Sequence, residues 1–230
     1  MSRNAAKIAL IAGLMMSGAA HAAEVPVFSG VAGSFNVAVT SIKEARFEKV
    51  IKQQYDFSCG SAALATLLTY HYELPIGEDT VFTEMYKVGN QEKIRKEGFS
   101  LLDMKKFLKS RGFEANGFKT SLDKLAGVGV PAIVLINTNG YRHFVVIKGV
   151  SESEVLVGDP ALGTRTYKRE AFEEIWNEIF FVVKQNVDVA RNYFNQDGEW
   201  SVRAKAPFGT ALNRSTLAAT TIMLPQIGDF

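Results

Sequence analysis

The sequence predicts an α+β fold in which helices come first along the chain and an antiparallel sheet follows. From about residue 59 to residue 112 the sequence predicts helices; beyond that, short runs rich in Val, Ile and Phe alternate with turn residues. The chain has 230 residues, of which 47% are hydrophobic and 22% charged, enough for a sizeable core. The net charge of +2, without a Lys/Arg-rich block, gives no reason to expect nucleic acid or acidic lipid as a partner.

The first residues are typical of a targeting signal. Arg3 and Lys7 precede an apolar run over residues 8–16, and Ala20-His21-Ala22 follows. A basic region, an apolar region and an A-x-A site predict a cleavable signal peptide over residues 1–22. The apolar run is shorter than the ~20 residues that cross a bilayer, and no later segment is long and apolar enough. We therefore expect a protein exported to a bacterial periplasm, with no transmembrane span in the mature chain.

Next comes an N-terminal extension, residues 23–49, whose weak alternation predicts short strands or a draped segment. A helix is expected from Cys59 to about His71, because the residue before Pro75 is pushed out of the helical region. The best-marked helix follows Ser100, which forms a capping box with Asp103. The predicted helices of this half are residues 59–71, 78–87 and 101–111, the last ended by Gly112.

The second half of the predicted domain is a sheet. Residues 131–136 form a buried strand by their β-branched content, residues 137–140 a hairpin turn, and residues 142–147 the return strand. Further strands are expected at residues 113–118, 155–157, 164–167 and 179–183, and helices at residues 121–125 and 169–177. Beyond about Asn186 the chain turns polar and irregular, which indicates a tail or an appended element. The expected main domain is thus residues 50–184, with a C-terminal extension over residues 185–230.

Cys59 is the only cysteine, and it begins the first predicted helix. Unpaired N–H groups and the positive end of the helix dipole favour a thiolate there. In an oxidising compartment structural cysteines come in pairs, so a single one indicates a reactive thiol or an intermolecular bridge. The alternative is that Cys59 packs as a small apolar residue in the core.

A cysteine nucleophile needs a base and a group that orients the base. His71 would lie ~18 Å from Cys59 along one helix, so it is excluded as the base and is expected to lie at the surface. His143 remains, on a strand of the second half; alternatively it is hydrogen-bonded and idle. Asp159 ends the neighbouring strand, and antiparallel pairing would bring it near the start of the His143 strand, unless it is only a turn residue before proline.

Acyl transfer also needs a donor for the developing oxyanion. By spacing alone, either Gln53 or Gln54 qualifies, and each is otherwise a solvated loop glutamine. No cluster of His, Cys and carboxylates has metal-ligand spacing and no glycine-rich phosphate loop is present, so neither a metal nor a cofactor is expected.

Three separated motifs together resemble the C39 peptidases, a papain-like family of cysteine peptidases best known for cutting bacteriocin leader peptides after a double glycine. The motifs are Ile51-Lys52-Gln53 followed five residues later by Cys59-Gly60-Ser61-Ala62-Ala63-Leu64-Ala65, then Arg142-His143-Phe144-Val145-Val146, then Val157-Gly158-Asp159-Pro160. The resemblance spans residues 50–183. It implies a papain-like fold, with N-terminal helices packed against the C-terminal sheet. It also implies Cys59 as nucleophile, His143 as base, Asp159 as orienting group, and Gln53 rather than Gln54 as oxyanion donor.

The chain departs from the family in two ways. Ser58 stands where many members have aspartate, and the best-known members are cytoplasmic domains of membrane transporters, so double-glycine specificity does not carry over. Stand-alone exported proteins that accompany export of functional amyloid also resemble this chain. The predicted function is an exported cysteine endopeptidase acting on a protein or peptide substrate, accessory to secretion of a protein such as functional amyloid and partnered by secretion-system components.

Two alternatives stay open from the residues. The first is a docking module that binds a secretion substrate without cutting it; such a domain is expected to lose its cysteine, and Cys59 is present. The second is acyl transfer to an amine, or hydrolysis of a non-peptide amide, which would use the same three residues.

Overall fold

The computed structural model describes residues 23–29, 33–39 and 41–201. The predicted signal peptide, residues 1–22, lies outside this range. The chain divides after Ser41 into two units. In the first, strands β1 (Ala23–Ser29) and β2 (Gly33–Val39) pair antiparallel, with Ala23 opposite Val39, which confirms the prediction of short strands.

The second unit contains the α+β domain, and its helices come first. These helices are α1 (Ile42–Arg46), α2 (Cys59–His71), α3 (Glu78–Val88), α4 (Gln91–Glu97) and α5 (Leu101–Ser110). The predicted start of α5 is confirmed: the Ser100 Oγ accepts from the Asp103 N–H at 3.3 Å, and the Asp103 carboxylate accepts from the Ser100 N–H at 2.9 Å. Helix α4 was not predicted, because its seven residues carry one buried apolar side chain, Ile94.

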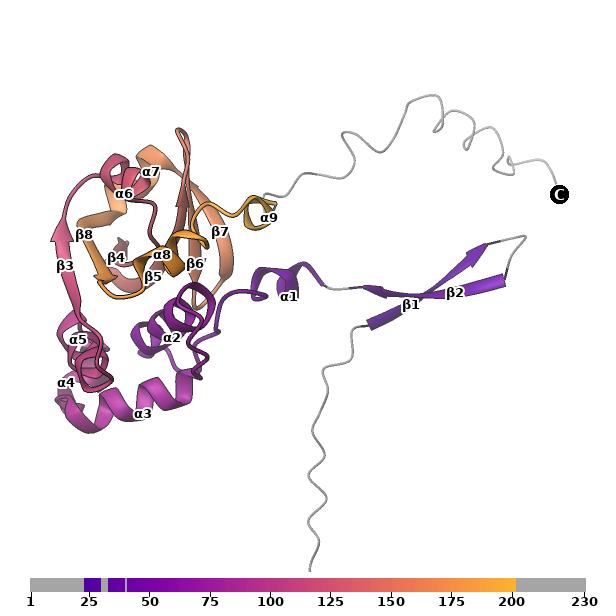
Figure 1. The fold of residues 1–230 in the computed structure, drawn as a ribbon. Coiled ribbons are helices and arrows are strands. Elements are labelled where there is room, and N and C mark those ends of the chain that lie inside the picture. The colour runs from indigo at the N-terminus through magenta and orange to yellow at the C-terminus, as the bar shows by residue number, and fades with distance from the viewer. Residues whose placement is uncertain (1–22, 30–32, 40, 202–230) are drawn as a thin grey trace, which may run out of the picture. The chain divides into compact units, whose positions relative to one another are not determined.

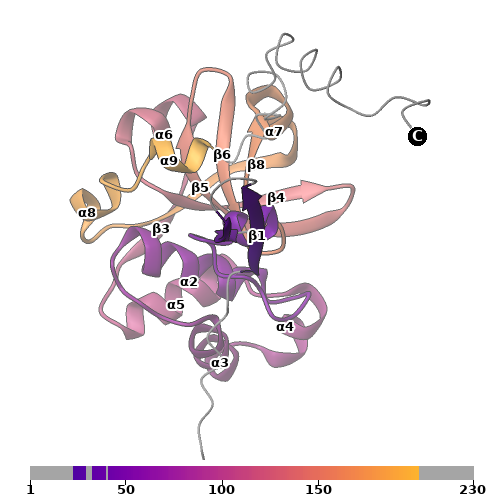
Figure 2. The same ribbon diagram turned by 90° about the vertical axis from the view of Figure 1, so that its right-hand side faces the viewer.

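The second half of this unit is a six-stranded antiparallel sheet with the strand order β3-β8-β4-β5-β6-β7. Its strands are β3 (Ala115–Lys119), β4 (Ala132–Thr138), β5 (Tyr141–Val150), β6 (Glu154–Asp159), β7 (Gly163–Lys168) and β8 (Trp176–Val183). Helices α6 (Leu122–Val128) and α7 (Arg169–Ile175) accompany the sheet. Figures 1 and 2 show helices α2 to α5 gathered on one side and the sheet with α6 and α7 on the other. The predicted order of helices and sheet is confirmed.

The central strand β5 is apolar on both faces because the sheet separates two cores. Phe144 and Val146 pack with α2 and α5 in one core, while Val145 and Ile147 pack with α7 in the other. This two-sided burial explains why β5 is a continuous apolar run rather than an alternating one. It also places one face of the strand against the helix that begins at Cys59.

Helix α2 is buried almost all round, which its Ala-rich sequence permits. At Gly60 the helix backbone packs closely against neighbouring side chains: a Cβ there would lie 2.9 Å from the Met104 Cε and 3.0 Å from the Phe99 Cβ. A helix without a polar face is a core helix. Cys59 is therefore held at a fixed point by packing along the whole of α2.

The expected position of His71 is wrong. His71 ends α2, but its side chain is fully buried and its ring meets the ring of Tyr193 edge-on at 6.3 Å. Burial lowers the pKa of His71 well below 6.5, and Lys148 and Lys49 lower it further. The reason lies in the chain after Asn186, which covers this end of α2.

That chain forms two short helices, α8 (Val187–Arg191) and α9 (Asp197–Trp200), and packs on the domain as an appended element. Ala190 and Phe194 are buried against the two cores. None of the helices in the described part of the chain combines the length and the apolar character that a membrane span requires.

Candidate active site

Cys59 is the first residue of α2, and it is buried with 6% of its surface exposed. The preceding residue, Ser58, does not cap the helix with its side chain. Instead its Oγ accepts from the Tyr55 N–H at 3.1 Å and donates to the Tyr55 carbonyl at 3.0 Å, which closes a tight turn. Ser58 therefore leaves the first N–H groups of α2 uncapped, at the positive end of the helix dipole where Cys59 stands.

His143 and Asp159 form a buried pair in the sheet. The His143 Nε2 lies 2.8 Å from the Asp159 Oδ1, and the two side chains are 7% and 3% exposed. The same oxygen accepts from the N–H groups of Ala161 at 2.8 Å and Leu162 at 3.2 Å, in the turn between β6 and β7. The turn thus fixes the carboxylate, and the carboxylate fixes the plane of the imidazole.

The imidazole also meets the cysteine. Burial alone would lower the pKa of His143, but the hydrogen bond to Asp159 and the nearby Cys59 side chain outweigh it and raise the pKa to about 9. The hydrogen bond of the ring runs through the Nε2, and the Nδ1 has no hydrogen-bond partner among the described residues. Burial acts to raise the pKa of Asp159, and the hydrogen bond and charge of His143 bring it below its usual 3.8. The site therefore favours a protonated imidazole beside the Asp159 carboxylate.

Gln53 and Gln54 differ clearly in the structure. Gln54 is exposed, whereas Gln53 is partly buried and its backbone N–H donates to the Pro160 carbonyl at 3.0 Å. The Gln53 Nε2 donates to the Tyr55 carbonyl at 3.0 Å, in the turn that precedes Cys59. Gln53 therefore joins the Cys59 turn to the residue after Asp159, and Gln54 contributes to neither.

Tyr141 is a residue of this site that the sequence analysis missed. Its ring stacks on the His143 ring at 5.7 Å with an angle of 27°, and its hydroxyl donates to the Asp56 carbonyl at 3.2 Å. Burial raises the pKa of Tyr141, and Cys59, Asp56 and Asp159 raise it further. The signal was available: an aromatic residue two positions before His143 lies on the same face of the strand.

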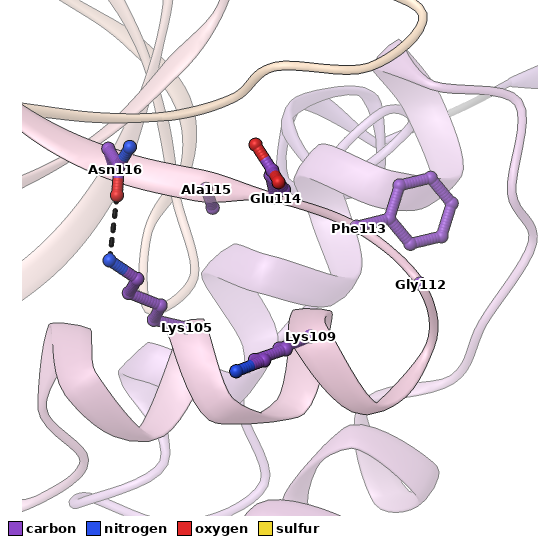
Figure 3. A pocket seen from close by; sticks show the side chains of 7 residues that line it. All are labelled: Lys105, Lys109, Gly112, Phe113, Glu114, Ala115 and Asn116. Carbon is purple, nitrogen blue, oxygen red and sulfur yellow. Dashed lines mark hydrogen bonds between the residues drawn. The ribbon is translucent and has the colours of Figure 1, made fainter.

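A pocket of about 410 Å³ opens elsewhere, between α5 and β3 (Figure 3). The Lys105 Nζ donates to the Asn116 Oδ1 at 2.7 Å across it, and Lys109 and Phe113 also line it. None of the predicted site residues contributes to its walls. Across residues 23–29, 33–39 and 41–201, no group of three or more His, Cys, Asp or Glu is placed to hold a metal ion.

The geometry agrees with comparisons to known proteins. The sequence profile of the Peptidase C39 family matches residues 47–188. The "Probable functional amyloid protease FapD" of Pseudomonas fluorescens and its counterpart of Pseudomonas aeruginosa are each 43% identical over 145 residues, which is 63% of this chain and 64% of theirs. The matched region thus spans less than two thirds of these relatives.

Two further matches come from transport proteins. The lactococcin-G-processing and transport ATP-binding protein LagD of Lactococcus lactis is 25% identical over 144 residues, which are 61% of this chain and 19% of LagD. The crystal structure of the peptidase domain of Streptococcus ComA superimposes with a TM-score of 0.50 at 21% identity, covering 59% of this chain and 96% of that domain. The fold predicted from the sequence, papain-like with helices on an antiparallel sheet, is confirmed. The chain belongs to the peptidase C39 family.

Proposed function

We propose that this protein is an exported cysteine endopeptidase that cleaves a peptide bond in a secreted or periplasmic protein. The observation that carries the proposal is the buried hydrogen bond between His143 and the Asp159 carboxylate, with the Cys59 side chain close enough to raise the pKa of His143. Membership of the peptidase C39 family supports it. Cys59, His143 and Asp159 could then act as nucleophile, base and orienting group.

Cleavage would proceed by acyl transfer. The Cys59 thiolate attacks the carbonyl carbon of the peptide bond, and the His143 imidazolium gives its Nδ1 proton to the leaving amine as the C–N bond breaks. Neutral His143 then takes a proton from water, whose oxygen attacks the thioester and releases the carboxylic acid and the Cys59 thiolate. Asp159 holds the imidazole plane through the Nε2 in both steps.

The oxyanion of each tetrahedral intermediate needs hydrogen-bond donors. The Cys59 backbone N–H at the start of α2 would supply one and the Gln53 side-chain amide the other. Because Gln53 is tied by its backbone to Pro160 and by its side chain to Tyr55, its amide is held beside both halves of the site before substrate arrives.

The location is proposed from the predicted signal peptide, and the substrate from the FapD relatives. The predicted signal peptide supports a periplasmic location for the mature chain, and the FapD relatives carry the description "Probable functional amyloid protease". We therefore assign this chain an accessory role in secretion of a protein such as functional amyloid, together with components of the secretion system. A strain carrying Cys59→Ala should lose at least one processed terminus among its exported proteins, as read by terminal-peptide mass spectrometry. An unchanged set of termini would instead favour the docking module.

The two glutamines provide a matched pair of variants. Gln53→Ala should lower kcat by about 10²–10³-fold with little change in KM, because an oxyanion donor acts in the transition state. The substrate for this measurement is a synthetic peptide spanning the terminus that depends on Cys59 in the strain comparison. Gln54→Ala, on an exposed side chain, should leave kcat within about twofold. If Gln53→Ala and Gln54→Ala changed kcat equally, Gln53 would not be the oxyanion donor.

A further inference from the structure

The pairing of β5 with β6 contains a register shift at Lys148. On one side of the shift Gly149 lies opposite Leu156, and on the other Ile147 lies opposite Val157. Between these two pairs strand β5 advances by two residues and strand β6 by one, so Lys148 is the extra residue. This is a β-bulge, a feature that re-aims the side chains that follow it.

The bulge determines the face on which Asp159 lies. Beyond it Val146 is opposite Gly158, so the next pair is Val145 with Asp159. Opposite residues share a face and faces alternate along a strand, so Asp159 shares its face with Val145 and with His143. Without the extra residue Asp159 would lie opposite Val146 and face the other side. The His143–Asp159 pair therefore depends on this one inserted residue.

Asn195 forms hydrogen bonds with the backbone groups of β5 at the bulge. Strand β4 pairs with β5 only as far as Ile147, and beyond that point Asn195 takes its place at the edge. The Asn195 N–H donates to the Lys148 carbonyl at 2.9 Å, the Val150 N–H donates to the Asn195 Oδ1 at 2.8 Å, and the Asn195 Nδ2 donates to the Val150 carbonyl at 3.1 Å. Asn195 has a φ of 57°, a left-handed conformation that asparagine tolerates well.

The side chain of Lys148 is fixed by the same segment. It is 1% exposed, its ammonium pairs with the Glu199 carboxylate, and its Nζ also donates to the Lys49 carbonyl at 3.1 Å. Its stem lies on Gly158, where a Cβ would come within 3.1 Å of the Lys148 Cδ. A buried ammonium without a carboxylate is strongly unfavourable, so Glu199 keeps Lys148 in this position beside the residue that precedes Asp159.

We propose that Asn195 and Glu199 are positioning residues of the candidate active site, which hold the bulge at Lys148 and so the register that brings Asp159 to His143. Both residues lie beyond residue 188, where the match to the family profile ends. The segment from Asn192 to Trp200 is then part of the peptidase rather than an attachment to it. The importance of these two residues for catalysis rests on the proposed function. Their effect on the position of Asp159 beside His143 does not.

The test is the titration of His143, followed by NMR in a Cys59→Ala background with His143→Gln for assignment. Asn195→Gly removes the side-chain bonds to Val150 while leaving the left-handed backbone free. Separation of the imidazole from a carboxylate should lower the pKa of His143 by about 1 unit or more. Asp188→Ala, which removes an exposed ion pair with Arg191 in the preceding helix α8, should leave the titration unchanged.

Glu199→Gln is the second variant, and it should lower the pKa of His143 in the same direction by a smaller amount. If Asn195→Gly does not fold, the titration of His143 in Glu199→Gln alone tests the inference. A folded Asn195→Gly or Glu199→Gln protein in which His143 titrates as in the parent would overturn the inference. Because the titration needs neither Cys59 nor a substrate, failure of the proposed peptidase activity would leave this result intact, and the two failures are distinguishable.

Discussion

Replacement of His143 by alanine should lower kcat/KM for the Cys59-dependent peptide by about 10²–10⁴-fold, the usual contribution of a positioned acid–base group. Two losses combine. The imidazolium that stabilises the Cys59 thiolate disappears, and so does the proton donor for the leaving amine. Both follow from the buried contacts of His143 with Cys59 and Asp159.

His71→Leu is the matched control for this substitution. His71 ends the same helix, is buried and is replaced by a side chain of similar volume that suits its apolar surroundings. Its kcat/KM should stay within about threefold of the parent, provided that the protein unfolds at a similar temperature. Comparable activity in His143→Ala and His71→Leu would show that neither histidine is the base.

Asp159→Asn should move the basic limb of the pH profile of kcat/KM to lower pH. Protonated His143 is the active form, and its pKa of about 9 places the loss of activity at about pH 9 in the parent. The Asp159 carboxylate stabilises the imidazolium, so a neutral amide lowers this pKa, by about 1 to 3 units for a close charge pair. At pH 8.5 the variant should therefore be at least about threefold less active than the parent, and about 25-fold if the pKa falls by about 2 units, and the gap should narrow as the pH falls.

Asp123→Asn is the control for the Asp159 variant. Asp123 carries an exposed carboxylate that pairs with Arg169 at 2.7 Å and takes no part in the site. Its pH profile should match that of the parent. A basic limb that stays at about pH 9 in Asp159→Asn would mean that another group controls it, and Asp159 would lose its role.

Much of this fold was predictable because local signals agreed with the tertiary structure. The capping box at Ser100, the hairpin turn at residues 137–140 and the β-branched run of β4 each determine an element over a few residues. The same holds for Cys59, whose place at the start of α2 follows from the small-residue run after it. Strand order and antiparallel direction predict that His143 and Asp159 lie near each other, but the shared face of the two residues also requires the bulge at Lys148.

The errors share a cause: they depend on contacts between distant parts of the chain. His71 was expected at the surface because it ends a helix, and a segment more than a hundred residues later covers it. The position of Tyr141 beside His143 could be predicted from the alternation of the strand, but its hydrogen bond to the Asp56 carbonyl joins distant parts of the chain and has no local signal. The bulge at Lys148 is similar, since its partners Asn195 and Glu199 lie in a stretch whose polar composition suggested a tail.

The central claim is that Cys59 is an activated nucleophile, and the rate of its alkylation by iodoacetamide at pH 6 tests it most directly. A free cysteine is only about 0.3% thiolate at that pH, because its ordinary pKa is about 8.5. The mature chain, unfolded in urea, supplies the same thiol without its site as the reference. Alkylation of the folded protein at least about tenfold faster than this reference, lost in His143→Ala, is the predicted result. A folded protein that reacts no faster than its unfolded form would contradict the account.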